Sequence, residues 1–208
     1  MIRLVYKGVA FPLLFTMLDK RGNSNSQERI HLINRFIGLF GKEVIKSVVA
    51  DREFVGKDWL AFLNRNEIRY YIRIRNNFKV FIPHKNKELN ASHLFNRFKT
   101  NEFVYYHKIV RVHGQLCNLS SCKLNPKNLK QEFLIIVSFN KPENAKEDYQ
   151  KRWKIEMCFK AMKSSGFDIE KTHLQDIQRI EKLLLIVMIA FVRCYKWDIS
   201  ESNKPNHN

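Results

Sequence analysis

The chain has 208 residues, of which 45% are hydrophobic and 12% aromatic, so it can bury a core and does not have the composition of a disordered protein. Its formal net charge is +17 and its pI is about 9.8. This balance indicates a polyanionic partner, nucleic acid first and an anionic membrane surface second.

The first third of the chain predicts alternating strands and helices. Alternating apolar runs favour strands at residues 2–6, 10–18, 45–50 and 68–74. A helical period of apolar residues predicts helices at residues 26–40 and 55–65, with Ser26 as the N-cap of the first and Gly41 at its C-terminal end.

Asp51 directly follows the apolar run at residues 45–50. A carboxylate at the C-terminal end of a buried parallel strand lies where α/β sheets place their ligands. The alternative is a structural role, in which Asp51 caps the helix that begins near Val55. The local sequence does not decide between these two roles.

The middle of the chain is strongly basic. Residues 73–131 contain twelve Lys and Arg and two Glu, a net charge of +10. Strands are predicted at residues 78–82, 103–112 and 133–139, with a hairpin turn at His113-Gly114. Cations interleaved with aromatics suit contact with a nucleic-acid backbone and stacking on bases. The alternative is a soluble β-sheet with a charged outer face.

Cys117 and Cys122, with His107 and His113 nearby, raise the possibility of a zinc site. The cysteine spacing is looser than the usual Cys-x2-Cys knuckle, and the ligands would have to come from both arms of a hairpin. We therefore favour scattered residues over a metal site. The four cysteines have irregular spacing, which indicates a reducing cytoplasm rather than a disulfide framework.

The last third of the chain predicts two helices. Pro142 fits the first turn of a long helix that ends near Gly166, since its missing N–H costs little there. His173 is expected to be a structural cap or a hydrogen-bonding group. A second helix is predicted at residues 177–197, followed by a frayed polar tail. Its apolar run at residues 183–192 is too short to span a bilayer and indicates a core helix.

A polar stripe runs along the first of these helices. On a regular helix the side chains of five residues share an arc of roughly 80°: Tyr149, Arg152, Glu156, Lys160 and Lys163. In nucleic-acid chemistry the acid of such a stripe holds a metal, and the cations and phenol hold the DNA backbone. The alternative is a solvated helix face with an ion pair between Arg152 and Glu156.

The spacing Tyr-x2-Arg-x3-Glu-x6-Lys resembles the Y-R-E-K motif of bacterial insertion-sequence transposases of the DDE class. The stretch ADREFVGKDWLAFL, which contains Asp51, resembles the second catalytic block of the same family. The resemblance extends from near Met1 to about Val192. It implies an α/β fold, in which helices flank a ribonuclease-H-like mixed sheet. The core would begin with residues 1–72. An antiparallel β subdomain would be inserted at residues 73–140, followed by core helices at 141–197 and a polar tail at 198–208.

The resemblance also implies a chemistry. Three carboxylates, D, D and E, bind two divalent metals, for which Mg²⁺ is suited by its preference for hard oxygen ligands. Asp51 matches the second acid and Glu156 the third, so both are expected to be catalytic metal ligands. Tyr149, Arg152 and Lys163 match residues that hold DNA phosphates, and Lys160 joins them because it lies on the same helix face.

The expected partner is double-stranded DNA, at transposon ends and in the target. The resemblance also implies a homodimer, a nucleoid-associated cytoplasmic location and no membrane contact.

The resemblance fails at the front of the chain. In the family the first Asp ends a strand that precedes the one predicted at residues 2–6, and here no Asp occurs before Asp19. We therefore expect an N-terminally truncated domain that lacks the first core strand, has a gap in its sheet and is catalytically incomplete alone. The alternative is a non-catalytic DNA-binding relic or an inhibitory subunit.

Overall fold

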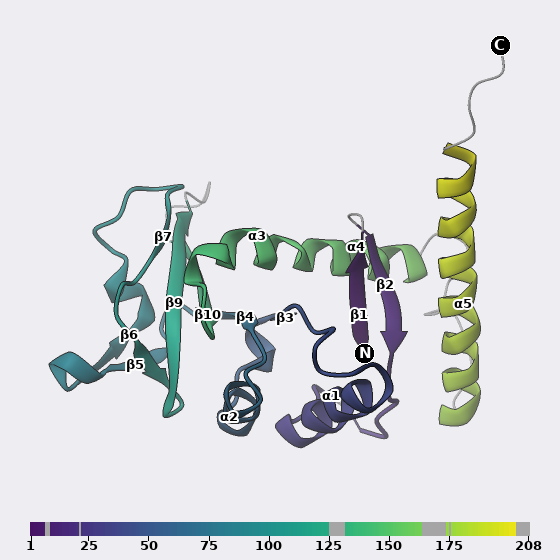
Figure 1. Ribbon diagram of the computed structural model, residues 1–208, viewed down its shortest axis with the longest axis horizontal. Helices are drawn as coiled ribbons and strands as arrows, with labels where there is room; N and C mark the ends of the chain where they lie inside the picture. The colour runs from purple at the N-terminus through teal and green to yellow at the C-terminus, as the bar shows by residue number, and fades with distance from the viewer. Residues whose placement is uncertain (7–8, 21, 125–131, 164–173, 175, 203–208) are drawn as a thin grey trace, which may run out of the picture. The chain divides into compact units, whose positions relative to one another are not determined.

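The computed structural model describes the chain except for residues 7–8, 21, 125–131, 164–173, 175 and 203–208 (Figure 1). The side chains of residues 158–159, 161–163 and 195–202 also lie outside the description. The chain forms two compact units, one of Met1–Gly22 with Trp153–Asn208 and the other of Asn23–Arg152. The predictions made for Gly166 and His173 lie outside the described residues.

The first unit contains a hairpin and most of two helices. Strands β1 (Ile2–Tyr6) and β2 (Val9–Leu14) pair antiparallel with each other, and the second strand is shorter than predicted. Helices α4 (Arg152–Lys163) and α5 (Ile177–Ser202) follow, α5 running past the predicted end at Trp197. Its apolar side packs Val187 and Met188 against Ala10 of β2. None of the described helices has the length and hydropathy needed to cross a bilayer.

The second unit is built on an eight-stranded mixed sheet. Its path runs through β3 (Val48–Ala50), β4 (Tyr70–Ile74), β10 (Glu132–Ser138), β9 (Gln115–Leu124), β8 (Val110–Val112), β5 (Lys79–Ile82) and β6 (Lys87–Asn90), while β7 (Phe103–Tyr105) pairs with β9. Only the β3–β4 pair is parallel among these strands. The mixed α/β class predicted from the sequence is thus present, and the sheet continues from β3 and β4 into the basic strands.

The prediction of one strand over residues 103–112 is wrong. Tyr105 pairs with Ser120, and Val110 pairs with Cys117. The five residue steps from Tyr105 to Val110 therefore lie opposite only three steps along β9. The surplus residues bulge out between β7 and β8, which an alternating pattern cannot reveal. The predicted turn after β8 is confirmed. His113 (φ 49°) and Gly114 (φ 79°) are both left-handed, as a two-residue hairpin between twisted strands requires.

The helices of the second unit pack on this sheet. Helix α1 (Ser26–Phe40) is capped one residue earlier than predicted, because Asn25 and not Ser26 is its N-cap and forms a reciprocal capping box with Glu28. Helix α2 (Lys57–Arg65) packs on β9, and the short α3 (Ala145–Gln150) packs on β3 and β4. The long helix predicted after Pro142 is divided: a 3₁₀ turn at Pro142–Asn144 precedes α3, and α4 begins after Lys151.

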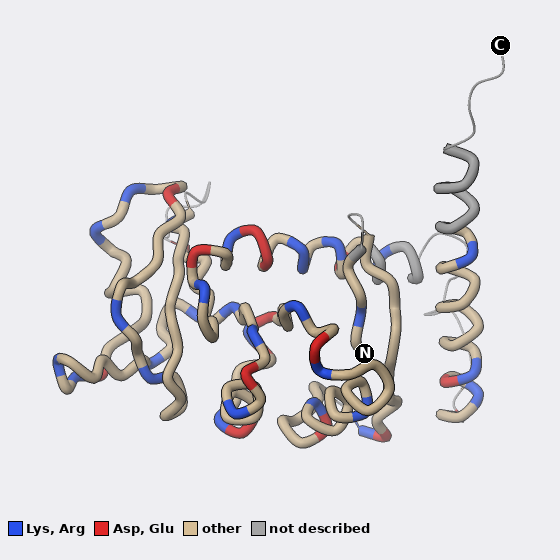
Figure 2. The backbone as a smooth tube through the Cα atoms, in the orientation of Figure 1, with Lys and Arg blue, Asp and Glu red and all other residues tan. Residues whose placement is uncertain are grey.

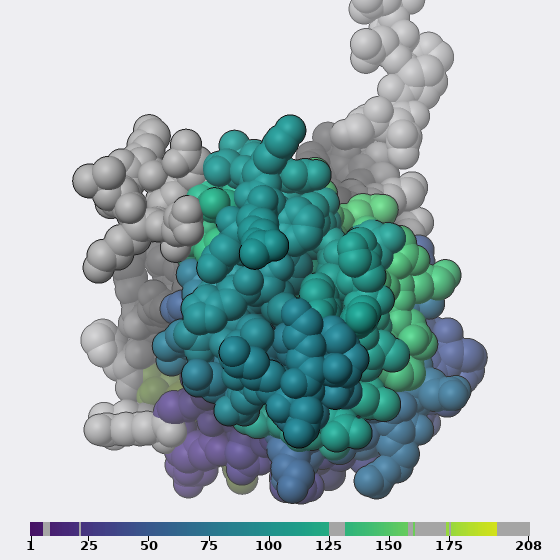
Figure 3. Space-filling model, turned by 90° about the vertical axis from the view of Figure 1, so that its left-hand side faces the viewer, coloured from purple at the N-terminus to yellow at the C-terminus, as the bar shows by residue number. Residues whose placement is uncertain are grey.

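Figure 2 shows Lys and Arg spread over strands β5 to β9, with few Asp or Glu among them. In the space-filling view of Figure 3 the same strands (teal) form the face turned toward the viewer. The basic character predicted for the middle of the chain therefore belongs to one continuous set of strands.

Candidate nucleic-acid site around Asp51

Asp51 is the first residue after β3, and its backbone is still extended (φ −86°, ψ 173°). Its Oδ1 accepts a hydrogen bond of 2.8 Å from the backbone N–H of Arg52 and so caps a 3₁₀ turn at Arg52–Phe54. The helix that begins at Lys57 is capped instead by Gly56, so the alternative in which Asp51 caps that helix is wrong. One carboxylate oxygen is thus used for local structure.

The second carboxylate oxygen of Asp51 faces Arg152. Oδ2 of Asp51 lies 3.5 Å from Nη1 of Arg152, and the two side chains are 35% and 16% exposed. The guanidinium carbon of Arg152 also lies 5.6 Å from the centre of the Tyr149 ring. The fold therefore brings together two residues that the sequence analysis took from separate motif blocks.

Tyr149 belongs to the core. Its side chain is 4% exposed and packs with Tyr71, Ile136 and Ala145, where α3 meets the sheet. Burial raises the pKa of its hydroxyl. The predicted contact between Tyr149 and a DNA phosphate stays a prediction, whereas its contact with the guanidinium of Arg152 is part of the described structure.

A second polar group, not predicted from the sequence, lies beside Tyr149. Asp148 is only 8% exposed and forms an ion pair with Lys151 at the end of α3. The hydrogen bond to Asp148 raises the pKa of Lys151. Burial, with the charge of Asp148 next, raises the pKa of Tyr71 to about 12. The i,i+3 spacing of Asp148 and Lys151 was visible in the sequence, but the burial of Asp148 was not.

A third charged group, around Glu53, was also not predicted from the sequence. Glu53 Oε1 lies 3.6 Å from Nε of Arg52 and 3.6 Å from Nη2 of Arg75, which follows β4. All three side chains are at least 43% exposed, so these pairs add little stability. They do keep cations beside the turn that carries Asp51. No sequence pattern links Glu53 to Arg75, because β4 brings them together.

The remaining predicted site residues lie on α4. Glu156 and Lys160 are exposed and stand one and two turns after Arg152 on the same helix. The side chain of Lys163 lies outside the description. Glu156 belongs to the first compact unit and Asp51 to the second. The predicted convergence of these two carboxylates therefore stays a prediction, whereas Asp51 and Arg152 are brought together.

The sequence profile of the family described as "Transposase DDE domain" matches residues 15–193. This chain belongs to that family. The match covers most of the 208 residues, including Asp51 and the stretch Tyr149–Lys163. No curated protein matches the chain. DDE transposases act on DNA and generally use divalent metal ions.

The residues of this DDE domain fit such a metal only in part. Carboxylate oxygens, as in Asp51 and Glu156, are the ligands that Mg²⁺ prefers. Within the described part of the chain, however, no three His, Cys, Asp or Glu side chains gather into a group that could hold an ion. Cys117, considered above for zinc, is buried and lies 3.1 Å from the hydroxyl of Tyr70. The described donors thus fall short of a complete metal centre.

Proposed function

We propose that this chain is the catalytic domain of an insertion-sequence DDE transposase, with a ribonuclease-H-like core that acts on the phosphodiester backbone of double-stranded DNA at transposon ends and in the target. The observation that carries the proposal is the pair of Asp51 and Arg152, 3.5 Å apart. These residues come from two sequence blocks that independently resemble the family. Their proximity supports a shared site at the end of β3.

In this proposal Asp51 and Glu156 supply carboxylate ligands for Mg²⁺. These two residues would hold the ion, which would supply activation of a water or a DNA 3′-hydroxyl and stabilisation of the leaving oxygen. Arg152, Lys160 and Lys163 hold the DNA phosphates. Tyr149 keeps the guanidinium of Arg152 in position from the core. The homodimer and the nucleoid-associated location expected above belong to the same proposal.

We propose further that these 208 residues do not form a complete catalytic centre. No Asp occurs before Asp19, so the sequence offers no counterpart of the first catalytic acid at the expected place. Among the described residues, β1 and β2 pair only with each other, and β3 pairs only with β4.

The second candidate function is non-catalytic: DNA binding by a transposase relic or by an inhibitory subunit. One observation favours it. Both carboxylate oxygens of Asp51 are already engaged, one by the N–H of Arg52 and one by Arg152. A carboxylate so engaged suits a structural role as well as a catalytic one.

A nicking assay on supercoiled plasmid with Mg²⁺ or Mn²⁺ tests both candidates. We expect the chain to bind the plasmid but not to nick it, because a two-metal centre needs more carboxylates than these two. Nicking that Asp51→Asn and Glu156→Gln abolish would disprove the incompleteness and establish the catalytic roles. Absence of duplex binding, measured at low salt, would remove both candidate functions.

A further inference from the structure

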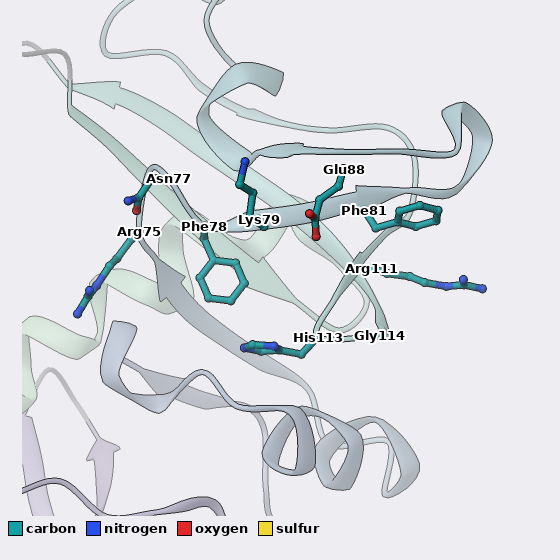
Figure 4. Close-up of a pocket in the computed structure, with 9 residues that line it drawn as sticks. All are labelled: Arg75, Asn77, Phe78, Lys79, Phe81, Glu88, Arg111, His113 and Gly114. Carbon is teal, nitrogen blue, oxygen red and sulfur yellow. The ribbon is translucent and has the colours of Figure 1, made fainter.

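A hollow of about 450 Å³ lies in the second compact unit, lined by residues of β5, β6 and β8, of the segment before β5 and of the turn after β8. Figure 4 shows the residues that line it, which include two phenylalanine rings, three cations and one carboxylate. Rings stack on bases and cations hold phosphates, so the set matches the chemical parts of a nucleotide.

Phe81 is the most informative of these residues because of the strand it occupies. In β5, Val80 and Ile82 are fully buried and face the core, so Lys79 and Phe81 face the other side of the sheet. The register sets Phe81 opposite Arg111 of β8 and Glu88 of β6. A half-buried phenyl ring on the solvent side of a sheet is not needed to fill the core.

One cation of the hollow lies near this ring, and two others line the hollow. The guanidinium carbon of Arg111 lies 6.0 Å from the centre of the Phe81 ring, and Lys79 is exposed two residues earlier on the same strand. Phe78 supplies a second half-buried ring, held edge-on to the ring of His113 at 5.2 Å between centroids. Arg75 is the third cation, and it also pairs with Glu53 in the turn after Asp51. Phosphates on either side of a stacked base would meet positive charge.

Glu88 is the one acid of the hollow and one of two among residues 73–131. Figure 4 shows its carboxylate between the rings of Phe78 and Phe81. An exposed carboxylate there repels phosphate and accepts hydrogen bonds only, so a pair of adjacent donors can bind both of its oxygens at once. Guanine has such a pair, its ring N1–H and its amino N2–H₂. Adenine and cytosine have an amino group beside an acceptor nitrogen.

We propose that this hollow binds one unpaired nucleotide of a DNA strand, with the base on Phe81 and Phe78, its flanking phosphates on Arg75, Lys79 and Arg111, and Glu88 selecting guanine. The identity of the strand as DNA rests on the proposed function. The site itself rests on the described residues of β5, β6 and β8. It shares Arg75 with the cations beside the turn that carries Asp51, and it requires no metal.

The stacking part of the proposal is tested by fluorescence anisotropy with the full chain. The probes are a thymidine strand of about 12 nucleotides with one central guanine and the duplex of the same length. Phe81→Leu keeps an apolar side chain but removes the ring. We expect it to weaken binding of the single strand by about tenfold and binding of the duplex much less.

Tyr105→Leu is the matched control, because Tyr105 is an exposed aromatic on β7 outside the hollow. Lys79→Ala should weaken binding of either probe more than Lys99→Ala, which removes an equal charge from an exposed residue outside the hollow. Equal losses from Phe81→Leu and Tyr105→Leu would disprove stacking in the hollow. Circular dichroism of each variant excludes misfolding as the cause.

The guanine part is tested by replacing the central guanine with inosine, which lacks only the amino group. We expect weaker binding of the inosine strand by about three- to tenfold. Glu88→Gln should remove this difference yet tighten binding of an all-thymidine strand, since it deletes a negative charge. A preference that survives in Glu88→Gln would disprove guanine selection by Glu88.

These outcomes are separable from those of the proposed function. If Phe81→Leu acts as expected while the plasmid assay excludes both candidate functions, the hollow is a site for single strands alone. If Arg152 variants weaken duplex binding and Phe81→Leu changes nothing, the proposed function stands and the hollow is not a nucleotide site.

Discussion

Oδ2 of Asp51 and Nη1 of Arg152 lie 3.5 Å apart. The pair connects the residue after β3 with the first residue of α4. Because the two side chains are partly buried, at 35% and 16% exposure, water screens their attraction less than at an open surface. A phosphate that recruits Arg152, or a cation that recruits Asp51, must therefore displace a partner that is already present.

Arg152→Gln should weaken duplex binding and reduce its salt dependence. Loss of one phosphate contact makes the negative slope of log affinity against log salt shallower by about 0.9. Arg35→Gln, on the exposed side of α1, removes the same charge elsewhere and is the control. Anisotropy titrations of a labelled duplex at several salt concentrations measure both slopes. An unchanged slope for Arg152→Gln would show that Arg152 serves Asp51 and not the DNA.

The same substitution should strengthen the binding of a divalent cation to Asp51. Removing a neighbouring positive charge deepens the negative potential at the carboxylate, by about 1 kcal/mol for a pair fully in water and by more here, because both side chains are partly buried. Mn²⁺ binding, followed by electron paramagnetic resonance, measures the change. The double variant Asp51→Asn with Arg152→Gln should lose the gain. If the double variant binds Mn²⁺ as tightly as Arg152→Gln, the ion is bound elsewhere.

Local signals in the sequence predicted much of the second unit. The apolar run before Asp51 gave β3, the His113-Gly114 dipeptide gave the β8–β9 turn, and Pro142 marked the start of a helical region. Each of these rests on a residue or run whose backbone preference is decided within a few positions. Such features do not depend on what the rest of the chain does.

Features that depend on long-range pairing could not be predicted. The bulge between β7 and β8 follows from the register of β9, and the Arg75–Glu53 pair follows from where β4 ends. The helical wheel grouped Arg152 with Glu156 but could not show that Asp51 faces Arg152. The same wheel gave Tyr149 a place in a polar stripe, whereas α3 turns it into the core. Packing against the sheet overrides the helical pattern there.

Tyr149→Ala should strongly destabilise the chain. Tyr149 is 4% exposed and fills the space between α3 and the sheet, so its truncation lowers the free energy of unfolding by about 3–5 kcal/mol. Tyr105→Ala is the control: the side chain is 45% exposed, and we expect a loss of about 0.5 kcal/mol. Urea unfolding followed by circular dichroism compares them. Similar losses for both variants would contradict the core position of Tyr149.

Stability should fall as the pH rises from about 9 to about 11, because of Cys117. Its thiol is 2% exposed, and burial raises its pKa from 9.0 to about 11. In this window the unfolded chain releases the proton while the folded chain keeps it, so the unfolded state binds fewer protons and stability decreases with pH. The loss between pH 9 and pH 10 is about 1 kcal/mol.

Cys117→Ala should make this part of the pH profile shallower, since the group that titrates is removed. Cys194→Ala, at an exposed cysteine on α5, should leave the profile unchanged. Urea unfolding at pH 8, 9 and 10 measures the three profiles at pH values that bracket the ordinary thiol pKa of 9.0. The hydroxyl of Tyr70 lies 3.1 Å from the Cys117 sulfur, and burial raises its pKa as well, so its own contribution falls at higher pH. A wild-type profile that is already flat across this range would contradict burial of the Cys117 thiol beside Tyr70.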